Sequence, residues 1–253
     1  MSLKDRVALV TGASRGIGAA TAEVLARRGA RVALSARTVA DLDHVAAAIK
    51  RGGGQTLVVP CDVLDQSQVE AMVRRVADEW GRLDILVNNA GMGTPQMPVE
   101  TIAPSDWDNT VALNLKSAFL AIRAAAPVMK AQKSGRIVNV SSYAGRNFSL
   151  ISGPQYSAAK AGMLALAKHM AAELGPFGIN VNSVAPSIVL TARVKAKWEA
   201  RTEEEQKTIL GRIPLRRLGQ PEEVATVIAF LASDDASYVN GVCIDINGGS
   251  FML

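Results

Sequence analysis

Residues 6–18 read RVALVTGASRGIG: a short apolar strand, a glycine-rich turn and the start of a helix. Gly12 permits a sharp exit from the strand, while Gly16 and Gly18 let the backbone approach a ligand and let the helix pack close to the sheet. The free N–H groups at a helix N-terminus attract phosphate. The spacing is GxxxGxG rather than GxGxxG, so the strand–turn–helix context carries the inference. The turn predicts a dinucleotide pyrophosphate site formed by Gly12, Ser14, Arg15, Gly16, Ile17 and Gly18.

Strand-like and helix-like runs alternate along the whole chain. We expect strands at residues 6–10, 31–36, 55–59, 83–87, 135–140, 179–184 and 241–246. We expect helices at residues 16–28, 39–50, 65–80, 104–132, 155–174, 191–211 and 221–232. Such alternation with right-handed crossovers gives a parallel sheet covered by helices. The sequence therefore predicts one domain over residues 1–253, an α/β Rossmann fold with a doubly wound parallel seven-stranded sheet and helices on both faces.

The composition indicates an aliphatic core and no nucleic-acid role. Of the 253 residues 49% are apolar but only 4% are aromatic, and the net charge is +5. Residues 191–217 hold eight basic and four acidic residues, which gives +4 of that +5. No zinc-finger spacing, aromatic RNA-binding signature or basic arm accompanies the charge, so we expect no nucleic-acid partner.

Two features indicate a cytoplasmic protein without metal or membrane contact. Cys61 and Cys243 are far apart and form no CxxC pair, which argues against a metal site or a disulfide framework. The N-terminus does not read as a secretion signal, and we see no apolar run near the roughly 18 residues of a membrane span. We therefore predict a cytoplasmic location and no membrane partner.

The end of the second predicted strand favours NADP(H) over NAD(H). An NAD enzyme places a carboxylate there to bind the ribose 2′-hydroxyl, whereas this chain has Ala36 followed by Arg37. An arginine can grip a 2′-phosphate that a carboxylate would repel, and Arg15 in the glycine turn is a second candidate. Asp62, followed by Val63, ends the third strand. Two roles stay open for Asp62: contact with the adenine amino group, or capping of the next helix within residues 62–65.

Four residues form a candidate catalytic set. Tyr156 and Lys160 lie one helical turn apart on one face. A tyrosine with a pKa near 10 needs tuning to exchange protons near neutral pH, and a nearby ammonium favours the phenolate. Ser142 ends the fifth predicted strand, where a hydroxyl can donate to a substrate carbonyl. Asn114, inside the long helix, is a candidate to hold a water that feeds protons to Lys160. Each residue alone is weak evidence. The site is predicted because all four occur together, in this order and on the expected helices and strand ends.

These motifs together resemble the short-chain dehydrogenase/reductase family over essentially the whole chain. Residues 11–18 match the TGxxxGxG of that family, and Asn88, Asn89, Ala90 and Gly91 match its NNAG stretch. Asn114, Ser142, Tyr156 and Lys160 match its catalytic tetrad. The resemblance implies hydride transfer between the nicotinamide of NADP(H) and a carbonyl or secondary alcohol. Tyr156 would act as acid/base, Ser142 would hold the oxygen, and Lys160 would bind the ribose.

The same resemblance implies further cofactor contacts. Asn89, Ala90 and Gly91 would border the cofactor, with Pro186, Ile188 and Thr191 after the sixth strand. Where the family usually has Pro-Gly, this chain has Pro186-Ser187, which puts the hinge of the following segment in question. That segment, residues 191–217, is expected to be a mobile lid over the substrate. Its basic residues suit either an anionic substrate or a solvated helix face, and the interleaved glutamates favour the latter.

The expected partner is a small carbonyl or alcohol substrate. Within the family the chain most resembles the 3-oxoacyl-carrier-protein reductases. Residues 175–178 read GPFG, where those enzymes often have an arginine, which weakens the thioester interpretation. A general ketone, sugar or steroid dehydrogenase remains an equal alternative. A non-catalytic NADP(H)-sensing regulator is the rival from another class, although the tetrad is complete. Apolar stretches on several sides of the long helices, together with the resemblance, predict a homotetramer.

Overall fold

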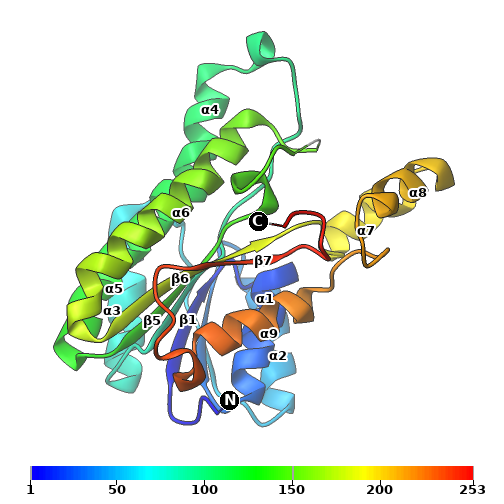
Figure 1. The fold of residues 1–253 in the computed structure, drawn as a ribbon. Coiled ribbons are helices and arrows are strands. Elements are labelled where there is room, and N and C mark those ends of the chain that lie inside the picture. The colour runs from blue at the N-terminus through cyan, green and yellow to red at the C-terminus, as the bar shows by residue number, and fades with distance from the viewer. Residues whose placement is uncertain (1, 150, 253) are drawn as a thin grey trace.

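A single parallel sheet of seven strands forms the centre of the molecule (Figure 1). The structure is a computed structural model that describes residues 2–149 and 151–252. The strand order is β3-β2-β1-β4-β5-β6-β7, so the winding reverses between β1 and β4, which pair in parallel. The strands are β1 (Val7–Thr11), β2 (Arg31–Ser35), β3 (Thr56–Val58), β4 (Ile85–Asn88), β5 (Gly135–Val140), β6 (Ile179–Pro186) and β7 (Cys243–Ile246). The predicted doubly wound fold is confirmed.

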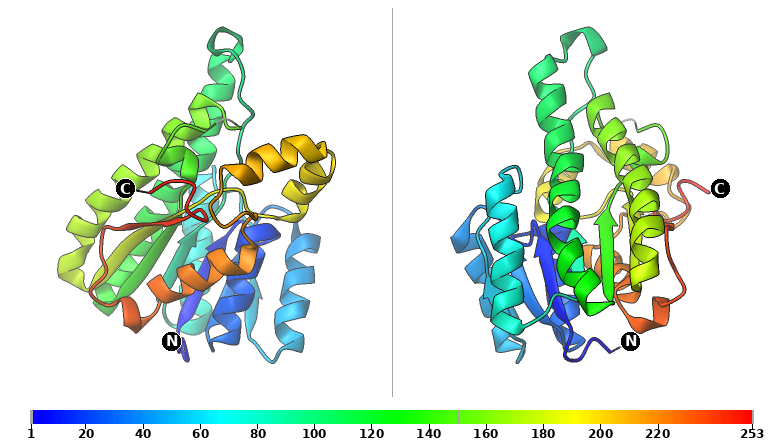
Figure 2. Two further views of the ribbon diagram at one scale, coloured as in Figure 1. Left: turned by 45° about the vertical axis from the view of Figure 1, so that its right-hand side comes forward. Right: turned by 90° about the vertical axis from the view of Figure 1, so that its left-hand side faces the viewer.

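Helices cover both faces of the sheet (Figure 2). One face packs against α1 (Gly16–Arg27), α2 (Val39–Arg51) and α9 (Pro221–Leu231). The other packs against α3 (Gln66–Trp80), α5 (Ser117–Gln132) and α6 (Pro154–Leu174). Alternate residues of a strand point to opposite faces of the sheet. Val10 and Val87 pack against the first group of helices, and Leu9 and Leu86 pack against the second. Burial of both faces explains why the strands read as continuous apolar runs.

The remaining elements surround the carboxyl ends of the strands or link the layers. They are α4 (Pro104–Val111), a π-helical turn η2 (Ala112–Lys116), α7 (Ala192–Glu199) and α8 (Glu203–Gly211). Short 3₁₀ turns are η1 (Val99–Thr101), η3 (Tyr143–Gly145), η4 (Gly175–Phe177) and η5 (Asp234–Ala236). In Figure 1 α4 and the α7–α8 pair extend beyond the sheet on two sides of the same edge. Ligands of doubly wound folds bind at that edge, at the point where the winding reverses.

Two predicted helices differ from the structure. The expected helix over residues 104–132 is continuous but contains the π turn η2 in its middle. The expected helix over residues 191–211 is two helices, because Thr202 and Glu205 form a capping box that starts α8.

The expectation that no stretch has the length of a membrane span is wrong as stated. Among the described residues, the continuous helix Pro104–Gln132 is long and apolar enough by length and composition. Helices in the core of globular proteins can have the same length and apolar composition. This one packs Leu120, Ile122 and Met129 against the sheet. The feature is therefore explained by the fold of the protein.

Candidate active site

The glycine turn after β1 is shaped so that side chains would not fit. Gly12 and Gly16 have φ values of +64° and +59°. A Cβ on Gly18 would collide with the Gly12 carbonyl oxygen and lie 2.5 Å from Asn89 Nδ2. Arg15, the N-cap of α1, makes no side-chain cap bond, and the first turn of α1 has no acidic residue. The first N–H groups of α1 are thus not capped by a side chain. This fits a pyrophosphate.

The end of β4 fastens this turn to the sheet. Asn89 Nδ2 donates to the carbonyl oxygens of Thr11 (3.0 Å) and Gly12 (3.1 Å). In return Thr11 Oγ1 accepts the N–H groups of Asn89 and Ala90, both at 3.1 Å. These bonds join β1 to β4 where the winding reverses. Ser14 and Ile17 are half-buried at the same turn.

The residues expected at the adenosine end are less closely fixed. Arg37 is exposed just after β2. Arg15 Nη2 lies 3.6 Å from Asp41 Oδ2, and both side chains are largely exposed. Asp62 Oδ1 accepts the Leu64 N–H at 3.0 Å, while Asp65 caps α3. The capping alternative for the stretch 62–65 is therefore present in the structure, and Val63 beside it is buried.

Helix α6 places Tyr156 and Lys160 together at the carboxyl edge. Lys160 Nζ lies 5.7 Å from the centre of the Tyr156 ring, and the lysine is only 3% exposed. Its Nζ donates to the Val140 carbonyl oxygen at 2.8 Å, which anchors α6 to the end of β5. Ser142, two residues beyond that strand, lies close enough to Tyr156 for its hydroxyl to lower the pKa of the phenol. The structure thus brings a hydroxyl, a phenol and an ammonium to one place.

Burial governs the charges of this group. Burial raises the pKa of Tyr156, and the hydrogen bond from Ser142 opposes that rise. Burial also lowers the pKa of Lys160, from 10.5 to about 8. The direction for Tyr156 is opposite to the lowering expected from a neighbouring ammonium. Desolvation of the phenolate is the larger effect on Tyr156, whose ring centre lies 5.7 Å from Lys160 Nζ. The polypeptide alone therefore keeps Tyr156 protonated at neutral pH.

Asn114 lies in the π turn η2 and is completely buried. Its Nδ2 donates to the carbonyl oxygens of Met92 (3.1 Å) and Thr110 (3.0 Å). Its Oδ1 accepts the Met92 N–H at 3.0 Å, which leaves one lone pair. A Cβ on Gly91 would lie 2.5 Å from Asn114 Oδ1 and 3.3 Å from Lys160 Nζ. Gly91 lies next to both Asn114 and Lys160, and there is no room for a side chain at that position.

The segment after β6 joins the sheet to α7. Ser187 donates its N–H to the Ile246 carbonyl at 3.0 Å and has no positive φ, so a serine fits where glycine was expected. The Ile188 carbonyl accepts the Gly219 N–H at 3.1 Å. Thr191 Oγ1 accepts the Val194 N–H and caps α7. A Cβ on Gly16 would lie 3.0 Å from Thr191 Cγ2, so the segment begins against the glycine turn.

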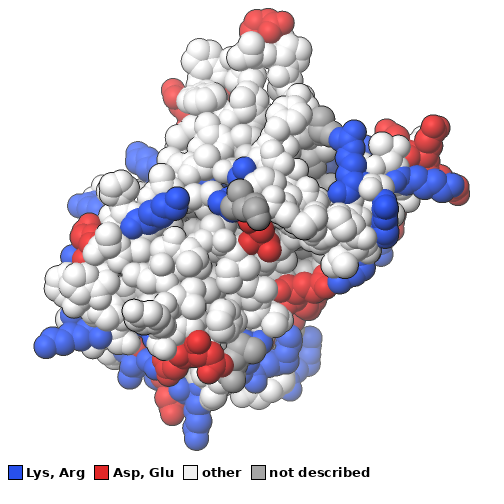
Figure 3. Space-filling model, viewed as in Figure 1, with Lys and Arg blue, Asp and Glu red and all other residues white. Residues whose placement is uncertain are grey.

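Ion pairs within α7 and α8 involve most of the glutamates. They join Lys195 to Glu199, Arg201 to Glu205 and Lys207 to Glu203. Acidic and basic side chains therefore alternate over this part of the surface (Figure 3). This agrees better with a solvated helix face than with a single anion site.

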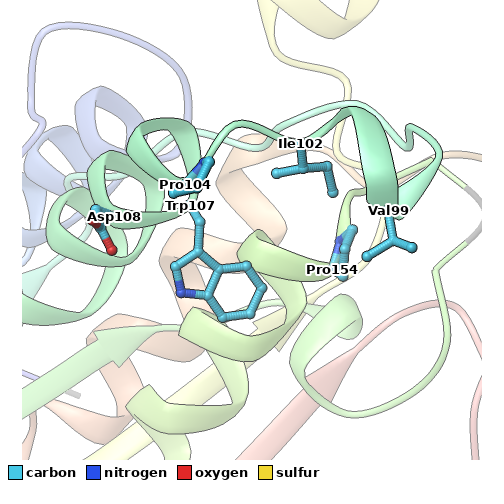
Figure 4. A pocket seen from close by; sticks show the side chains of 6 residues that line it. All are labelled: Val99, Ile102, Pro104, Trp107, Asp108 and Pro154. Carbon is cyan, nitrogen blue, oxygen red and sulfur yellow. The ribbon is translucent and has the colours of Figure 1, made fainter.

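Apolar side chains surround the carboxyl edge. Met92, Phe148 and Ile151 are 50%, 68% and 49% exposed. A separate hollow of about 360 Å³ lies between η1, the start of α4 and the start of α6 (Figure 4). The Trp107 ring faces Ile102 and Pro154 there. No tetrad residue lines the hollow.

Two neighbours of the tetrad were missed by the sequence reasoning. Ser141 Oγ donates to the Lys160 carbonyl at 2.8 Å, and a Cβ on Gly145 would lie 2.6 Å from the Lys160 carbonyl carbon. Both hold η3 against α6. A glycine shortly after a strand-end serine was the only signal of this close contact, and nothing in the pattern pointed to Ser141.

Comparison with known proteins places this geometry in a family. A family model described as enoyl-(acyl carrier protein) reductase, of the short-chain dehydrogenase/reductase type, matches residues 12–250. The chain belongs to the short-chain dehydrogenase/reductase family. The predicted resemblance is confirmed, and this dehydrogenase/reductase is an oxidoreductase by family.

Similar members of the family differ in what they act on. This dehydrogenase/reductase is 40% identical to a 3-oxoacyl-[acyl-carrier-protein] reductase of Synechocystis, over 100% of the chain and 99% of the relative. It is 42% identical to a cis-4-hydroxycyclohexanecarboxylate dehydrogenase of Sinomonas cyclohexanicum, over 97% and 96%. A solved 3-oxoacyl-[acyl-carrier protein] reductase of Brucella melitensis with bound NAD superposes with a TM-score of 0.90, at 36% identity and over 100% and 93%.

Proposed function

We propose that this dehydrogenase/reductase interconverts a ketone and a secondary alcohol with NADP(H), with Tyr156 as the acid/base. The observation that supports this most is the meeting of Tyr156, Ser142 and Lys160 at the carboxyl end of β5, where a Cβ on Gly91 would lie 3.3 Å from Lys160 Nζ. A nicotinamide, when bound, supplies or accepts a hydride at its C4. The protein then has to position the carbonyl and move one proton.

Each of the four residues has one task in this proposal. Tyr156 donates its hydroxyl proton to the carbonyl oxygen as that oxygen gains negative charge, and Ser142 donates a hydrogen bond to the same oxygen. Lys160 uses one N–H for the Val140 carbonyl. A second N–H is proposed to bind the ribose hydroxyls, and the third is proposed to face the relay water. The free lone pair of Asn114 Oδ1 is proposed to hold the water that returns a proton to Tyr156 by way of Lys160.

The raised pKa of Tyr156 favours the direction of reduction. Reduction requires the protonated phenol, and burial raises the pKa so that this form dominates at neutral pH. Oxidation of an alcohol requires the phenolate. We therefore expect reduction to hold its rate through neutral pH and to fall at high pH, while oxidation rises with pH.

NADP(H) is proposed as the preferred cofactor because Ala36 and Arg37, and no carboxylate, stand directly after β2. Arg37 is exposed there, and Arg15 in the glycine turn, which also lies 3.6 Å from Asp41, is the second proposed contact of a 2′-phosphate. A solved relative holds NAD, so the two cofactors have to be compared directly in this enzyme. Further proposed contacts are Gly12, Ser14, Gly16, Ile17, Gly18, Asp62, Val63, Asn89, Ala90, Gly91, Pro186, Ile188 and Thr191.

The decisive experiment replaces the proposed acid. Tyr156→Phe should reduce kcat for ketone reduction at least about 1,000-fold, because the proton donor is lost while the ring still packs. NADPH binding, followed by fluorescence, should stay within a few-fold of wild type. Tyr143→Phe, the same change at the half-buried Tyr143 nearby, is the matched control. Full activity in Tyr156→Phe would exclude the assigned acid.

Two substrate classes are to be separated by a panel of ketones read at the nicotinamide absorbance. A 3-oxoacyl thioester and a 4-oxocyclohexanecarboxylate represent the two relatives. Sugar and steroid ketones cover the remaining alternatives. A regulator that binds NADP(H) without turnover has no supporting feature in the described residues. Such a protein would bind NADPH and turn over none of the panel.

We also propose that the enzyme is a cytoplasmic homotetramer. Exposed apolar side chains on and beside the outer helices and next to β7 support assembly, with Phe119 45%, Phe177 40% and Val242 37% exposed. Light scattering on the purified protein tests this. A monomeric mass at micromolar concentration would contradict it.

A further inference from the structure

The last residues of the chain pack against the turn that follows Ser142. The rings of Phe251 and Tyr143 meet edge to face, with centroids 6.3 Å apart and an angle of 88°. Arg146 Cζ lies 5.7 Å from the centre of the same Phe251 ring. Both partners belong to η3 or its end, and η3 begins directly after Ser142. Phe251 therefore contacts the serine turn at two points.

A bidentate ion pair gives this turn a third fastening. Arg146 Nε and Nη2 donate to the two carboxylate oxygens of Asp245 in β7, at 3.2 and 3.0 Å. Both side chains are only 21% exposed. Paired forks of this kind fix orientation as well as distance. The pair therefore ties the end of η3 to the last strand of the sheet.

The same C-terminal segment also contacts the exit of the lid. Gly248 and Gly249 have φ values of +62° and +85°, and a Cβ on them would lie 2.8 Å from Ile213 and 3.0 Å from Pro214. The Gly248 carbonyl accepts the N–H of Leu215 at 3.1 Å. Residues 213–215 directly follow α8. In Figure 1 the red C-terminal segment accordingly turns back toward the centre of the edge.

Asn247 gives the segment a defined shape. The residue is 7% exposed, and its Nδ2 donates to the Phe251 carbonyl at 2.9 Å. Its Oδ1 accepts the Gly249 N–H at 2.9 Å, and its carbonyl accepts Ser250 Oγ–H at 2.8 Å. This closed turn places Phe251 on η3 while Gly248 stays on the lid exit.

We propose that residues 245–251 form a brace that fixes the Ser142 turn relative to the lid exit, with Arg146 and Phe251 as positioning residues for proton transfer. The proposal rests on the proposed function of Ser142 and Tyr156. Without the brace, the Ser142 hydroxyl drifts from the Tyr156 hydroxyl and from the substrate oxygen. The printed ring contacts of Phe251 are with Tyr143 and Arg146, and neither is a proposed cofactor contact, so loss of the Phe251 ring should leave cofactor affinity unchanged.

The test compares Phe251→Ala with Met252→Ala, the next residue, which is 75% exposed. Phe251→Ala should lower kcat for ketone reduction by roughly 10-fold to 100-fold, as expected for a small misplacement of a catalytic group. The Kd for NADPH should not change. Met252→Ala should match wild type in both, and Phe251→Tyr, which keeps the ring, should recover most of the activity.

The pH profile supplies a readout that a general loss of stability would not move. In the enzyme without substrate the Ser142 hydroxyl lowers the pKa of Tyr156, so its displacement raises that pKa further, and the pH profile of kcat/KM reports this change. Reduction uses the protonated form, so the pH at which the rate falls should move upward in Phe251→Ala. Ser142→Ala, which removes the hydroxyl itself, gives the direction of the pH shift against which Phe251→Ala is compared. Hydrogen exchange should quicken at residues 144–147 and at Leu215 but not in α3.

Two outcomes separate the brace from the proposed function. If Ser142→Ala shifts the profile and Phe251→Ala changes neither rate, profile nor exchange, the brace is wrong and the function stands. If Ser142→Ala leaves both rate and profile as in wild type, the proposed function fails and the brace with it. Should Phe251→Ala not fold, Arg146→Lys, which keeps the charge and breaks the fork, takes its place with the same expectations.

Discussion

At the scale of single residues, Lys160 shows how the site costs stability. Its ammonium is 3% exposed and has one hydrogen bond, to the Val140 carbonyl, among the described residues. Burial without a carboxylate partner lowers its pKa to about 8. A shift of that size corresponds to roughly 3 kcal/mol against the charged form. The charged form of this lysine therefore costs the fold stability, and the proposed function gives a reason for its presence.

Lys160→Met should accordingly stabilise the protein at pH 7 while removing activity. Because the folded-state pKa lies below the unfolded value of 10.5, the unfolded chain binds more protons between about pH 8 and 10.5. Wild-type stability rises across that window, and below pH 8 the full cost is present. The gain of the variant, roughly 1–3 kcal/mol after loss of the Val140 bond, should shrink from pH 8 to 10.5. Urea unfolding without cofactor measures it.

The control for that experiment lies on the same helix. Lys168 is exposed two turns further along α6. Lys168→Met should change the free energy of unfolding by less than about 0.5 kcal/mol both at pH 7 and in the window from about pH 8 to 10.5. A Lys160→Met protein that is less stable than wild type at pH 7 would show that the ammonium is better solvated than its burial indicates.

The predicted preference for NADP(H) over NAD(H) depends mainly on Arg37. Loss of charge-assisted hydrogen bonds to a 2′-phosphate costs about 1.5–3 kcal/mol, so Arg37→Ala should raise the Kd for NADPH about 10-fold to 100-fold. NADH, which lacks that phosphate, should bind within about threefold of wild type. Arg51→Ala, an exposed arginine at the end of α2, is the matched control. Equal losses for both cofactors would remove the 2′-phosphate argument, and fluorescence titration decides between the results.

At the scale of elements, the close contact between α1 and the β1 turn depends on Gly18. A Cβ there would collide with the Gly12 carbonyl, so Gly18→Ala must push the start of α1 away. We expect a loss of about 1–3 kcal/mol and weaker binding of both cofactors. Gly52→Ala is the control, because Gly52 has φ −80° and its nearest contact would be 3.4 Å. Thermal unfolding and cofactor titration check both. Unchanged cofactor affinity in Gly18→Ala would contradict the proposal that the glycine turn binds the cofactor.

The elements also show what the sequence could predict. Hydrophobic periodicity located every strand and long helix to within a few residues, because it records which face is buried. It could not detect the π turn at Asn114, since one extra residue in a helix changes hydrogen-bond offsets and leaves the apolar face readable. The break between α7 and α8 was readable as Thr202 followed by Glu205. The contacts of Arg146 and Phe251 join residues about 100 positions apart and have no local pattern.

At the scale of the whole molecule, the two edges of the sheet have different tasks. The carboxyl edge gathers the buried lysine, the glycine turn and the exposed apolar side chains. The opposite edge holds an ion network around Asp84, which is 2% exposed. Asp84 accepts Arg82 Nε at 2.8 Å and the Val7 N–H at 2.8 Å, and Arg6 Nη1 lies 3.5 Å from it.

This division predicts that Asp84→Asn separates stability from activity. Removing the charge weakens the pair with Arg82, whose side chain is 41% exposed, and should cost about 1–3 kcal/mol, or roughly 5 °C in Tm for a domain of this size. The kcat at 25 °C should not change, since Asp84 lies just before β4 and Asn89 just after it, roughly 15 Å away along the strand. Asp234→Asn, at the 71% exposed end of the network, should cost under about 1 kcal/mol. A kcat that falls in step with Tm would mean that the network reaches the catalytic edge through β4.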